Sequence, residues 1–117
     1  MGNTVLLVED EETLCKAIGK YLHDRGYEVL TCFDGQEAIN SIKNVKYDIL
    51  VTDMGLPKAS GHDVMKESRK INPSVSVILA SGYYQPGLEK LGCDDFCHKP
   101  YNLKELEIMI KKHLDKS

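Results

Sequence analysis

The sequence predicts a single α/β domain in which helices cover both faces of a parallel β-sheet. Short apolar runs separated by helical segments are typical of parallel strands that are buried on both sides. Four such runs lead into Glu9, Asp53, Ser81 and Lys99, and a further strand is predicted over residues 27–32. Because strands and helices alternate regularly along the chain, we expect a three-layer sandwich.

The helices are predicted from apolar spacing and from start and stop signals. The first ends at Gly26, a common helix stop, and the second begins at a capping-box pattern over residues 34–37. The third ends before Pro73, and the last opens at Asn102. The residues expected to face the core are Leu14, Ala17, Ile18, Tyr21 and Leu22; Ala38, Ile39 and Ile42; Val64, Met65, Ser68 and Ile71; and Leu103, Leu106, Ile110 and Leu114.

One further helix is expected between Gly82 and Gly92, and it is short. Only Leu88 and Leu91 suggest helical spacing there, and Pro86 limits the helix to about two turns. The chain is therefore expected to contain five strand–helix units with a shortened fourth helix.

Composition excludes several classes of protein. The 117 residues, 42% of them hydrophobic, suit one soluble domain over residues 1–117 with no output domain attached. With a net charge of -3 there is no basic cluster for nucleic acid, and no apolar stretch approaches the ~20 residues that span a bilayer. No signal peptide precedes the first strand.

The four cysteines indicate a reducing compartment. None of them has the spacing of a zinc ribbon, and we interpret them as buried small residues of a cytoplasmic protein. The alternative, a metal site at Cys93, Cys97 and His98, lacks the repeated close pair that zinc sites prefer.

The strand ends predict one shared site. In a parallel sheet the C-terminal ends of all strands lie at the same edge, where ligands bind. Three carboxylates, a hydroxyl and an ammonium should therefore converge, from Glu9, Asp10, Asp53, Ser81 and Lys99. Each alone has an ordinary explanation as a helix cap, a loop residue or a turn. Their joint occurrence at the ends of four strands favours a site.

The charges at this site predict phosphoryl chemistry. Three carboxylates in one cleft raise one another's pKa, Lys99 offsets one charge, and a divalent cation would offset two more. Oxygen ligands suit Mg²⁺ or Mn²⁺ better than zinc. An aspartate can act as a nucleophile and form an acyl phosphate. Asp53 is the favoured nucleophile, because the adjacent Glu9 and Asp10 have the pattern of paired metal ligands.

The chain resembles the receiver domains of two-component response regulators over essentially its whole length. The motifs that carry the resemblance are residues 7–11, Asp53 followed by Pro57 and Gly61, residues 80–82, and residues 98–100. Residues 2–8 and 81–83 are most like receivers attached to hybrid histidine kinases. The resemblance implies a flavodoxin-like fold with strand order 2-1-3-4-5, a turn through Pro57 and Gly61, and a site at the switch point.

The resemblance also implies roles for the residues around the phosphoryl group. Asp53 is the phosphoacceptor, and Ser81 and Lys99 contact the phosphoryl group. The family's switch pairs the hydroxyl residue with an aromatic residue, and Phe96 matches that position, with simple core packing as the alternative. The Lys99–Pro100 bond is expected to be cis.

For the metal, the resemblance implies four ligands. Asp10 and Asp53 bind Mg²⁺ directly, Glu9 binds it largely through water, and the backbone carbonyl of Gly55 adds a further ligand.

The implied function is that of a phosphoacceptor signalling domain in a phosphorelay. It accepts a phosphoryl group from a phosphohistidine of a histidine kinase or phosphotransfer protein, switches conformation, and acts on an unknown downstream protein. It is not a free-standing enzyme, although it catalyses its own phosphorylation and dephosphorylation. We expect a cytoplasmic monomer or weak dimer, without nucleic-acid or membrane contact, either standing alone or excised from a hybrid kinase.

Two departures from the family pattern affect this expectation. The spacing from Ser81 to Lys99 is shorter than usual by about one helical turn, which argues against the usual dimer. In the family, the positions of Gly55 and Tyr83 influence hydrolysis of the acyl phosphate, and their opposite sizes leave its lifetime open.

Three other functions compete with this reading. An aspartyl-phosphate hydrolase would need a second aspartate where Gly55 stands. A flavodoxin would need a phosphate-binding first loop, whereas residues 9–12 are all acidic and would repel the phosphate. A degenerate receiver that only binds proteins would have no need of the five chemically competent site positions.

Overall fold

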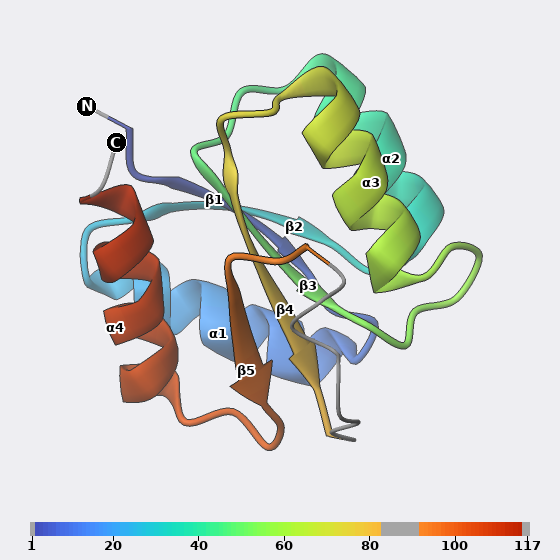
Figure 1. Cartoon of the computed structure of the whole chain (residues 1–117). Helices are drawn as coiled ribbons and strands as arrows, with labels where there is room; N and C mark the ends of the chain where they lie inside the picture. The colour runs from blue at the N-terminus through green and yellow to red at the C-terminus, as the bar shows by residue number, and fades with distance from the viewer. Residues whose placement is uncertain (1, 83–91, 116–117) are drawn as a thin grey trace.

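The computed structural model describes residues 2–82 and 92–115. A five-stranded parallel sheet lies between two pairs of helices (Figure 1). The strands are β1 (Thr4–Val8), β2 (Glu28–Cys32), β3 (Ile49–Asp53), β4 (Ser76–Ser81) and β5 (Asp95–His98). The helices are α1 (Glu12–Asp24), α2 (Gly35–Asn44), α3 (Gly61–Ile71) and α4 (Leu103–Leu114). The strand order β2-β1-β3-β4-β5 confirms the predicted order.

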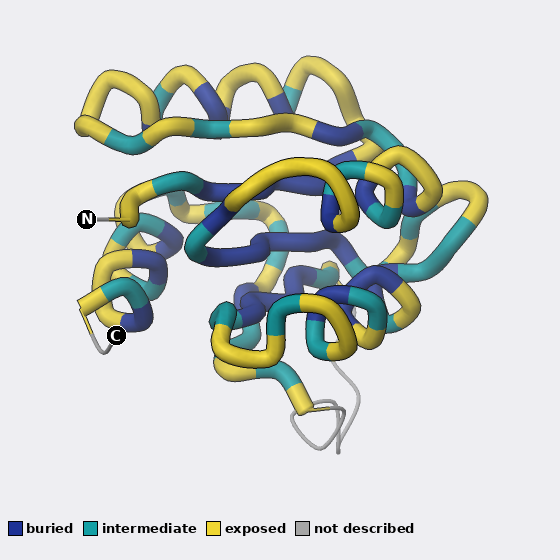
Figure 2. The backbone as a smooth tube through the Cα atoms, turned by 90° about the horizontal axis from the view of Figure 1, so that it is seen from above, coloured by how far each residue is buried: buried dark blue, intermediate teal, exposed yellow. Residues whose placement is uncertain are grey.

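The central strands β1, β3 and β4 are buried on both faces, whereas the edge strand β2 is largely exposed. Successive side chains of a strand point to opposite sides of the sheet. Val5 and Leu7 pack into a cluster with α1 and α4, whereas Leu6 and Val8 pack into a second cluster with α2 and α3. In Figure 2 the central strands form the buried centre, and the exposed stretches lie on the helices, the loops and the edge strand β2. This burial on both sides explains why the central strands are nearly continuous apolar runs in the sequence.

The helix signals hold with two corrections. The predicted cap of α2 is present, since Asp34 Oδ1 accepts a 2.8 Å hydrogen bond from the Glu37 amide. Ala17 is exposed rather than core-facing, because it lies beside the buried stripe of α1 and not on it. Ile71 is 40% exposed, because it is the last residue of α3 and follows the end of the buried stripe at Ser68.

The cysteines are all free, and three of them are buried, with Cys93 partly buried. The alternative of a metal site at Cys93, Cys97 and His98 is not supported, since these residues do not gather as a ligand group within residues 2–82 and 92–115. In the same part of the chain, no helix combines the length and the apolar character needed to cross a membrane. The predicted short fourth helix and Tyr83 lie outside the described residues.

Candidate functional site

The parallel strands deliver polar side chains to one edge of the sheet. Glu9 and Asp10 follow β1, Asp53 ends β3, Ser81 ends β4 and Lys99 follows β5. The register of the strand pairs sets how far each residue lies along the sheet. Asp53 of β3 pairs with Ala80 of β4, and Ser81 of β4 pairs with His98 of β5.

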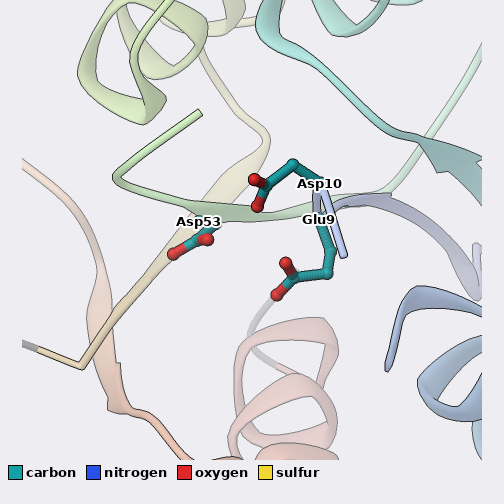
Figure 3. Close-up of side chains that lie close together, drawn as sticks. All are labelled: Glu9, Asp10 and Asp53. Carbon is teal, nitrogen blue, oxygen red and sulfur yellow. The ribbon is translucent and has the colours of Figure 1, made fainter. Parts of the chain in front are cut away.

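Three of these side chains form a compact carboxylate cluster (Figure 3). Glu9, Asp10 and Asp53 each offer an oxygen atom, and these oxygens all lie within 4.8 Å of one another. Glu9 is fully buried and Asp53 is 6% exposed, while Asp10 is exposed to solvent. The cluster is therefore buried at Glu9 and Asp53 and open to solvent at Asp10.

Lys99 reaches across the sheet to the two buried carboxylates. Its Nζ lies 2.7 Å from Glu9 Oε1 and 3.1 Å from Asp53 Oδ2, so one ammonium bridges both side chains. The second Glu9 oxygen, Oε2, accepts a 3.0 Å hydrogen bond from the Glu11 amide. At the backbone, the Lys99 amide donates to the Ser81 carbonyl at 3.0 Å, which fixes β5 beside β4 at the site.

The surroundings of these groups shift their pKa values. Burial raises the pKa of Asp53, and the Asp10 carboxylate adds to the rise, although Lys99 opposes it. Burial likewise raises the pKa of Glu9, with a further contribution from Asp53. Burial alone would lower the pKa of Lys99, but its bonds to Glu9 and Asp53 outweigh that effect and raise it. Burial thus disfavours the negative charge of these carboxylates, and the single Lys99 ammonium offsets it only in part.

The donor set fits a hard divalent cation. All three side chains offer oxygen atoms, the ligands that Mg²⁺ prefers, and Asp10 keeps the cluster open toward solvent. With the three carboxyls ionised, Lys99 balances one charge and leaves two for a cation. An Mg²⁺ ion held here would keep positions free for water and phosphate oxygens.

The turn after β3 is packed against the site. A Cβ atom added to Gly61 would lie 2.1 Å from the Asp53 carbonyl oxygen, so no larger residue fits there. Ser60 caps α3 through a reciprocal capping box with Asp63. The Pro57 carbonyl accepts a 3.1 Å hydrogen bond from Gly35 at the start of α2. At Gly55, by contrast, an added Cβ would meet nothing within 4 Å.

The remaining predicted residues lie near this edge. Ser81 is partly buried at the end of β4. Phe96 is partly buried against the core cluster on the α2 and α3 side, and its ring meets the His98 ring edge to face with 5.0 Å between centroids. The Lys99–Pro100 peptide is cis, which confirms the prediction.

Sequence reasoning missed one residue that contacts the site. Lys99 Nζ lies over the ring of Tyr101, 5.5 Å from its centroid. The position of an aromatic residue directly after the Lys–Pro pair was the available signal for this contact, because the turn brings residue 101 back beside Lys99.

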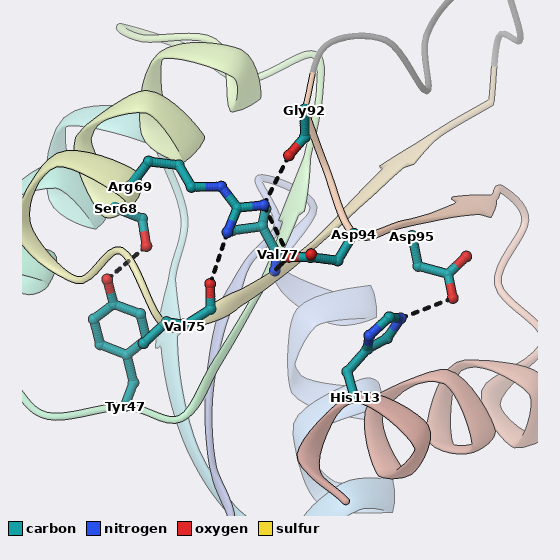
Figure 4. A network of polar contacts seen from close by, with 9 residues as sticks. All are labelled: Tyr47, Ser68, Arg69, Val75, Val77, Gly92, Asp94, Asp95 and His113. Atoms are coloured by element: carbon teal, nitrogen blue, oxygen red, sulfur yellow. Dashed lines mark hydrogen bonds and ion pairs between the residues drawn. The ribbon is translucent and has the colours of Figure 1, made fainter. Parts of the chain in front are cut away.

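A second polar network lies at the opposite edge of the sheet (Figure 4). Arg69 of α3 donates to the Val75 carbonyl at 2.9 Å, to the Gly92 carbonyl at 2.7 Å and to Asp94 Oδ2 at 2.8 Å. The Val77 amide at the start of β4 also donates to Asp94 Oδ2, at 2.7 Å. These bonds join α3, β4 and the segment that leads into β5, far from the carboxylate cluster.

The next residue along the chain, Asp95, contacts α4 in the other helical layer. Asp95 Oδ2 lies 3.0 Å from Nε2 of His113, a buried residue in the last turn of α4. Two adjacent residues, Asp94 just before β5 and Asp95 at its start, therefore connect this part of the chain to α3 and to α4.

Comparison with known proteins identifies close relatives of this arrangement. The family model of the response regulator receiver domain matches residues 5–111. The alkaline phosphatase synthesis transcriptional regulatory protein PhoP of Bacillus subtilis is 32% identical over 122 residues, covering 100% of this chain and 50% of that protein. Sensor kinase CckA of Brucella abortus is 34% identical over 122 residues, covering 97% of this chain and 13% of that protein.

Solved structures agree in fold. The response regulator protein TrrA of Thermotoga maritima, in complex with Mg(2+)-BeF, has a TM-score of 0.86 at 30% identity, covering 97% of this chain and 99% of that one. The receiver domain of the hybrid histidine kinase CckA has a TM-score of 0.80 at 32% identity, covering 95% and 98%. The chain spans about half the length of the curated relatives it matches first, because the alignments cover 50% of each of those proteins.

Proposed function

This chain belongs to the response regulator receiver domain family, and we propose that Asp53 is the residue that accepts the phosphoryl group. The observation that carries the proposal is the Lys99 ammonium, which lies within 3.1 Å of both Glu9 and Asp53 beside an exposed Asp10. A nucleophilic carboxylate, a fixed cation and an oxygen cluster for a metal are the parts that phosphoryl transfer to aspartate requires.

In the proposed reaction an Asp53 carboxylate oxygen attacks the phosphorus atom of a phosphohistidine. An O–P bond forms, the P–N bond breaks, and its electron pair leaves with the imidazole of the donor. The Lys99 ammonium contacts the phosphoryl oxygens and stabilises the negative charge that develops on them. The Ser81 hydroxyl donates a hydrogen bond to one of these oxygens. Hydrolysis of the acyl phosphate by water then returns Asp53 to its free form.

Glu9, Asp10 and Asp53 would hold Mg²⁺, with the Gly55 carbonyl as a further ligand. When bound, the ion neutralises charge on the phosphoryl oxygens and so permits the approach of an anionic donor. The related TrrA structure in complex with Mg(2+)-BeF supports Mg²⁺ as the metal. Mn²⁺, which also prefers oxygen ligands, is the expected substitute.

The proposal includes the wider role of the chain. The donor is a histidine kinase or phosphotransfer protein, and the output is a change in contact with a downstream protein, through Ser81 and Phe96. We place the chain in the cytoplasm, where free cysteines such as Cys15, Cys32 and Cys97 persist. Light scattering should find a monomer or weak dimer, because residues 81–99 are short for the usual dimer face.

The test is intact mass after incubation with acetyl phosphate and Mg²⁺. We expect one added phosphoryl group in the wild-type chain and none in Asp53→Asn. The matched control is Asp24→Asn, the same change at an exposed residue of α1, which should be labelled like the wild type. Labelling of Asp53→Asn would move the phosphoacceptor elsewhere. No labelling of any chain, with Mg²⁺ also failing to bind, would refute the proposal.

A further inference from the structure

Tyr101 places an aromatic ring against the Lys99 ammonium. Lys99 Nζ lies over this ring, 5.5 Å from its centroid, within the distance at which a cation is attracted to the negative face of an aromatic ring. The ring reaches this place because the chain turns after Lys99 and returns before α4 begins at Leu103.

The hydroxyl of Tyr101 does not explain the position of this side chain. It is buried, and within the described residues it has no hydrogen-bond partner. A buried hydroxyl without a partner is unfavourable, so the hydroxyl is not what holds Tyr101 in place. The ring is therefore the part of the side chain that acts on its surroundings.

Packing fixes the ring. Tyr101 lies against the core cluster that includes Cys15, Cys97 and Leu106. Burial raises the pKa of Tyr101, and the nearby charges of Glu9 and Asp53 add to the rise, which agrees with a ring held close to the carboxylate cluster. A ring fixed by the core is a rigid surface on which a flexible lysine side chain can rest.

Lys99 needs such a surface. Its side chain is long and flexible, and its ammonium has three hydrogen-bond donors. Bonds to Glu9 and Asp53 use two of them, and both bonds lie on the carboxylate side of the ammonium. The attraction of the Tyr101 ring restrains the ammonium from another direction and so keeps it beside Glu9 and Asp53.

We propose that Tyr101 is a positioning residue for Lys99, whose ring holds the ammonium where the arriving phosphoryl group requires it. This inference rests on the proposed function of Asp53 and assigns Tyr101 no contact with the phosphoryl group. It predicts that the rate of phosphorylation depends on the electron density of the ring at position 101 and not on the hydroxyl.

The experiment measures the rate constant of phosphorylation by acetyl phosphate at saturating Mg²⁺. Tyr101→Phe should keep the wild-type rate, because the ring remains. Tyr101→Leu should lower it about three- to tenfold, the size expected of one cation–π contact. Replacement of Tyr101 by mono-, di- and trifluorophenylalanine should lower the rate stepwise, because fluorine withdraws electron density from the ring face with little change of shape.

Tyr21→Leu is the matched control. Its ring carries a similar contact, with the Arg25 guanidinium 5.6 Å from the centroid, on a helix away from the site. This variant should be phosphorylated at the wild-type rate. The Mg²⁺ affinity of every variant should also stay unchanged, since Tyr101 is not among the expected ligands.

The outcomes separate this inference from the function on which it rests. A wild-type chain that takes no phosphoryl group overturns both. Wild-type phosphorylation with an equal rate in Tyr101→Leu overturns the role of Tyr101 alone. A slow Tyr101→Leu with no gradation across the fluorinated rings assigns Tyr101 to packing, and overturns the inference as well.

Discussion

Gly61 lies so close to Asp53 that a single added methyl group would collide with the backbone of the predicted phosphoacceptor. The Cβ would lie 2.1 Å from the Asp53 carbonyl oxygen, well inside contact distance. The first residue of α3 and the last residue of β3 are thus packed directly against each other. The backbone of Asp53 can hold this position because Gly61 has no side chain.

Gly61→Ala should therefore destabilise the fold and slow phosphorylation together. We expect the free energy of unfolding to fall by about 1–3 kcal/mol, the size typical of an added carbon that forces a backbone shift in a packed region. Urea unfolding measures it. Gly55→Ala is the control, because its Cβ meets nothing within 4 Å, and it should change stability by less than about 0.5 kcal/mol. Equal midpoints for the two variants would contradict the close approach.

Asp10→Asn should weaken Mg²⁺ binding while leaving the apo fold intact. Asp10 is exposed and lies in the carboxylate cluster, so its removal takes away a ligand without opening the core. For the wild type, Mg²⁺ at ten times its Kd should raise the free energy of unfolding by about 1.4 kcal/mol. At that concentration Asp10→Asn should show little of this gain. Glu12→Gln, an equal charge change just outside the cluster, should keep it.

Asp53→Asn should become more stable than the wild type as pH rises in the absence of metal. The pKa of Asp53 is raised above its ordinary value of 3.8, so the native state holds its proton longer than the unfolded state. Between these two pKa values the wild type loses stability with rising pH. The difference between variant and wild type should grow from pH 4 upward. Urea unfolding in EDTA across this range measures it.

Asp24→Asn should change the dependence of stability on pH in the opposite direction. Its hydrogen bond and ion pair with Lys20 lower the pKa of Asp24, so this carboxylate stabilises the fold at neutral pH and loses that effect as pH falls. Asp24→Asn should thus gain nothing relative to the wild type as pH rises. The same trend in both variants would contradict the assigned shift of Asp53.

Tyr101→Phe should stabilise the fold. The Tyr101 hydroxyl is buried and has no partner among the described residues, and leaving such a group unpaired costs about 1–3 kcal/mol. Removing it while keeping the ring should recover about 1 kcal/mol of this. Thermal and urea unfolding measure the gain. A loss of stability instead would indicate that the hydroxyl is hydrogen-bonded in solution.

Arg69→Leu should lower the free energy of unfolding by about 1–2 kcal/mol, because it removes three hydrogen bonds that are partly exposed. The rate of phosphorylation should stay unchanged, since the network lies at the edge away from the site. Lys20→Leu, which breaks an exposed ion pair within α1, should leave unfolding unchanged and serves as the control. A loss of phosphorylation in Arg69→Leu would show that the two edges are coupled.

The sequence was sufficient to predict the sheet and the residues at its C-terminal edge. Strands buried on both faces produce apolar runs, and parallel strands bring their ends together, so Asp53 and Lys99 could be placed side by side without any structure. The cap at Asp34 was predicted from neighbouring residues, because capping is local. The cis Lys99–Pro100 bond was expected from the family resemblance.

Contacts between distant side chains could not be predicted in this way. Arg69 and Asp94 lie 25 positions apart, and their bond depends on the side-chain directions of two elements that meet only in the folded chain. His113 is a polar residue near a helix end, yet it is buried on the same stripe of α4 as Leu106 and Ile110 and contacts Asp95. Helical spacing also misplaced Ala17 and Ile71, since it does not fix the exact width of a buried stripe or the point along a helix where burial ends.

The Arg69 network and the carboxylate cluster lie at opposite ends of β4, whose six residues span roughly 20 Å. Effects at sites separated by more than about 10 Å, without shared partners, usually add. Substitutions near Arg69 can then change how much of the protein survives folding and degradation in a cell, while Asp53 keeps its chemistry. Natural variation at one end of the sheet can tune abundance, and variation at the other can tune signalling.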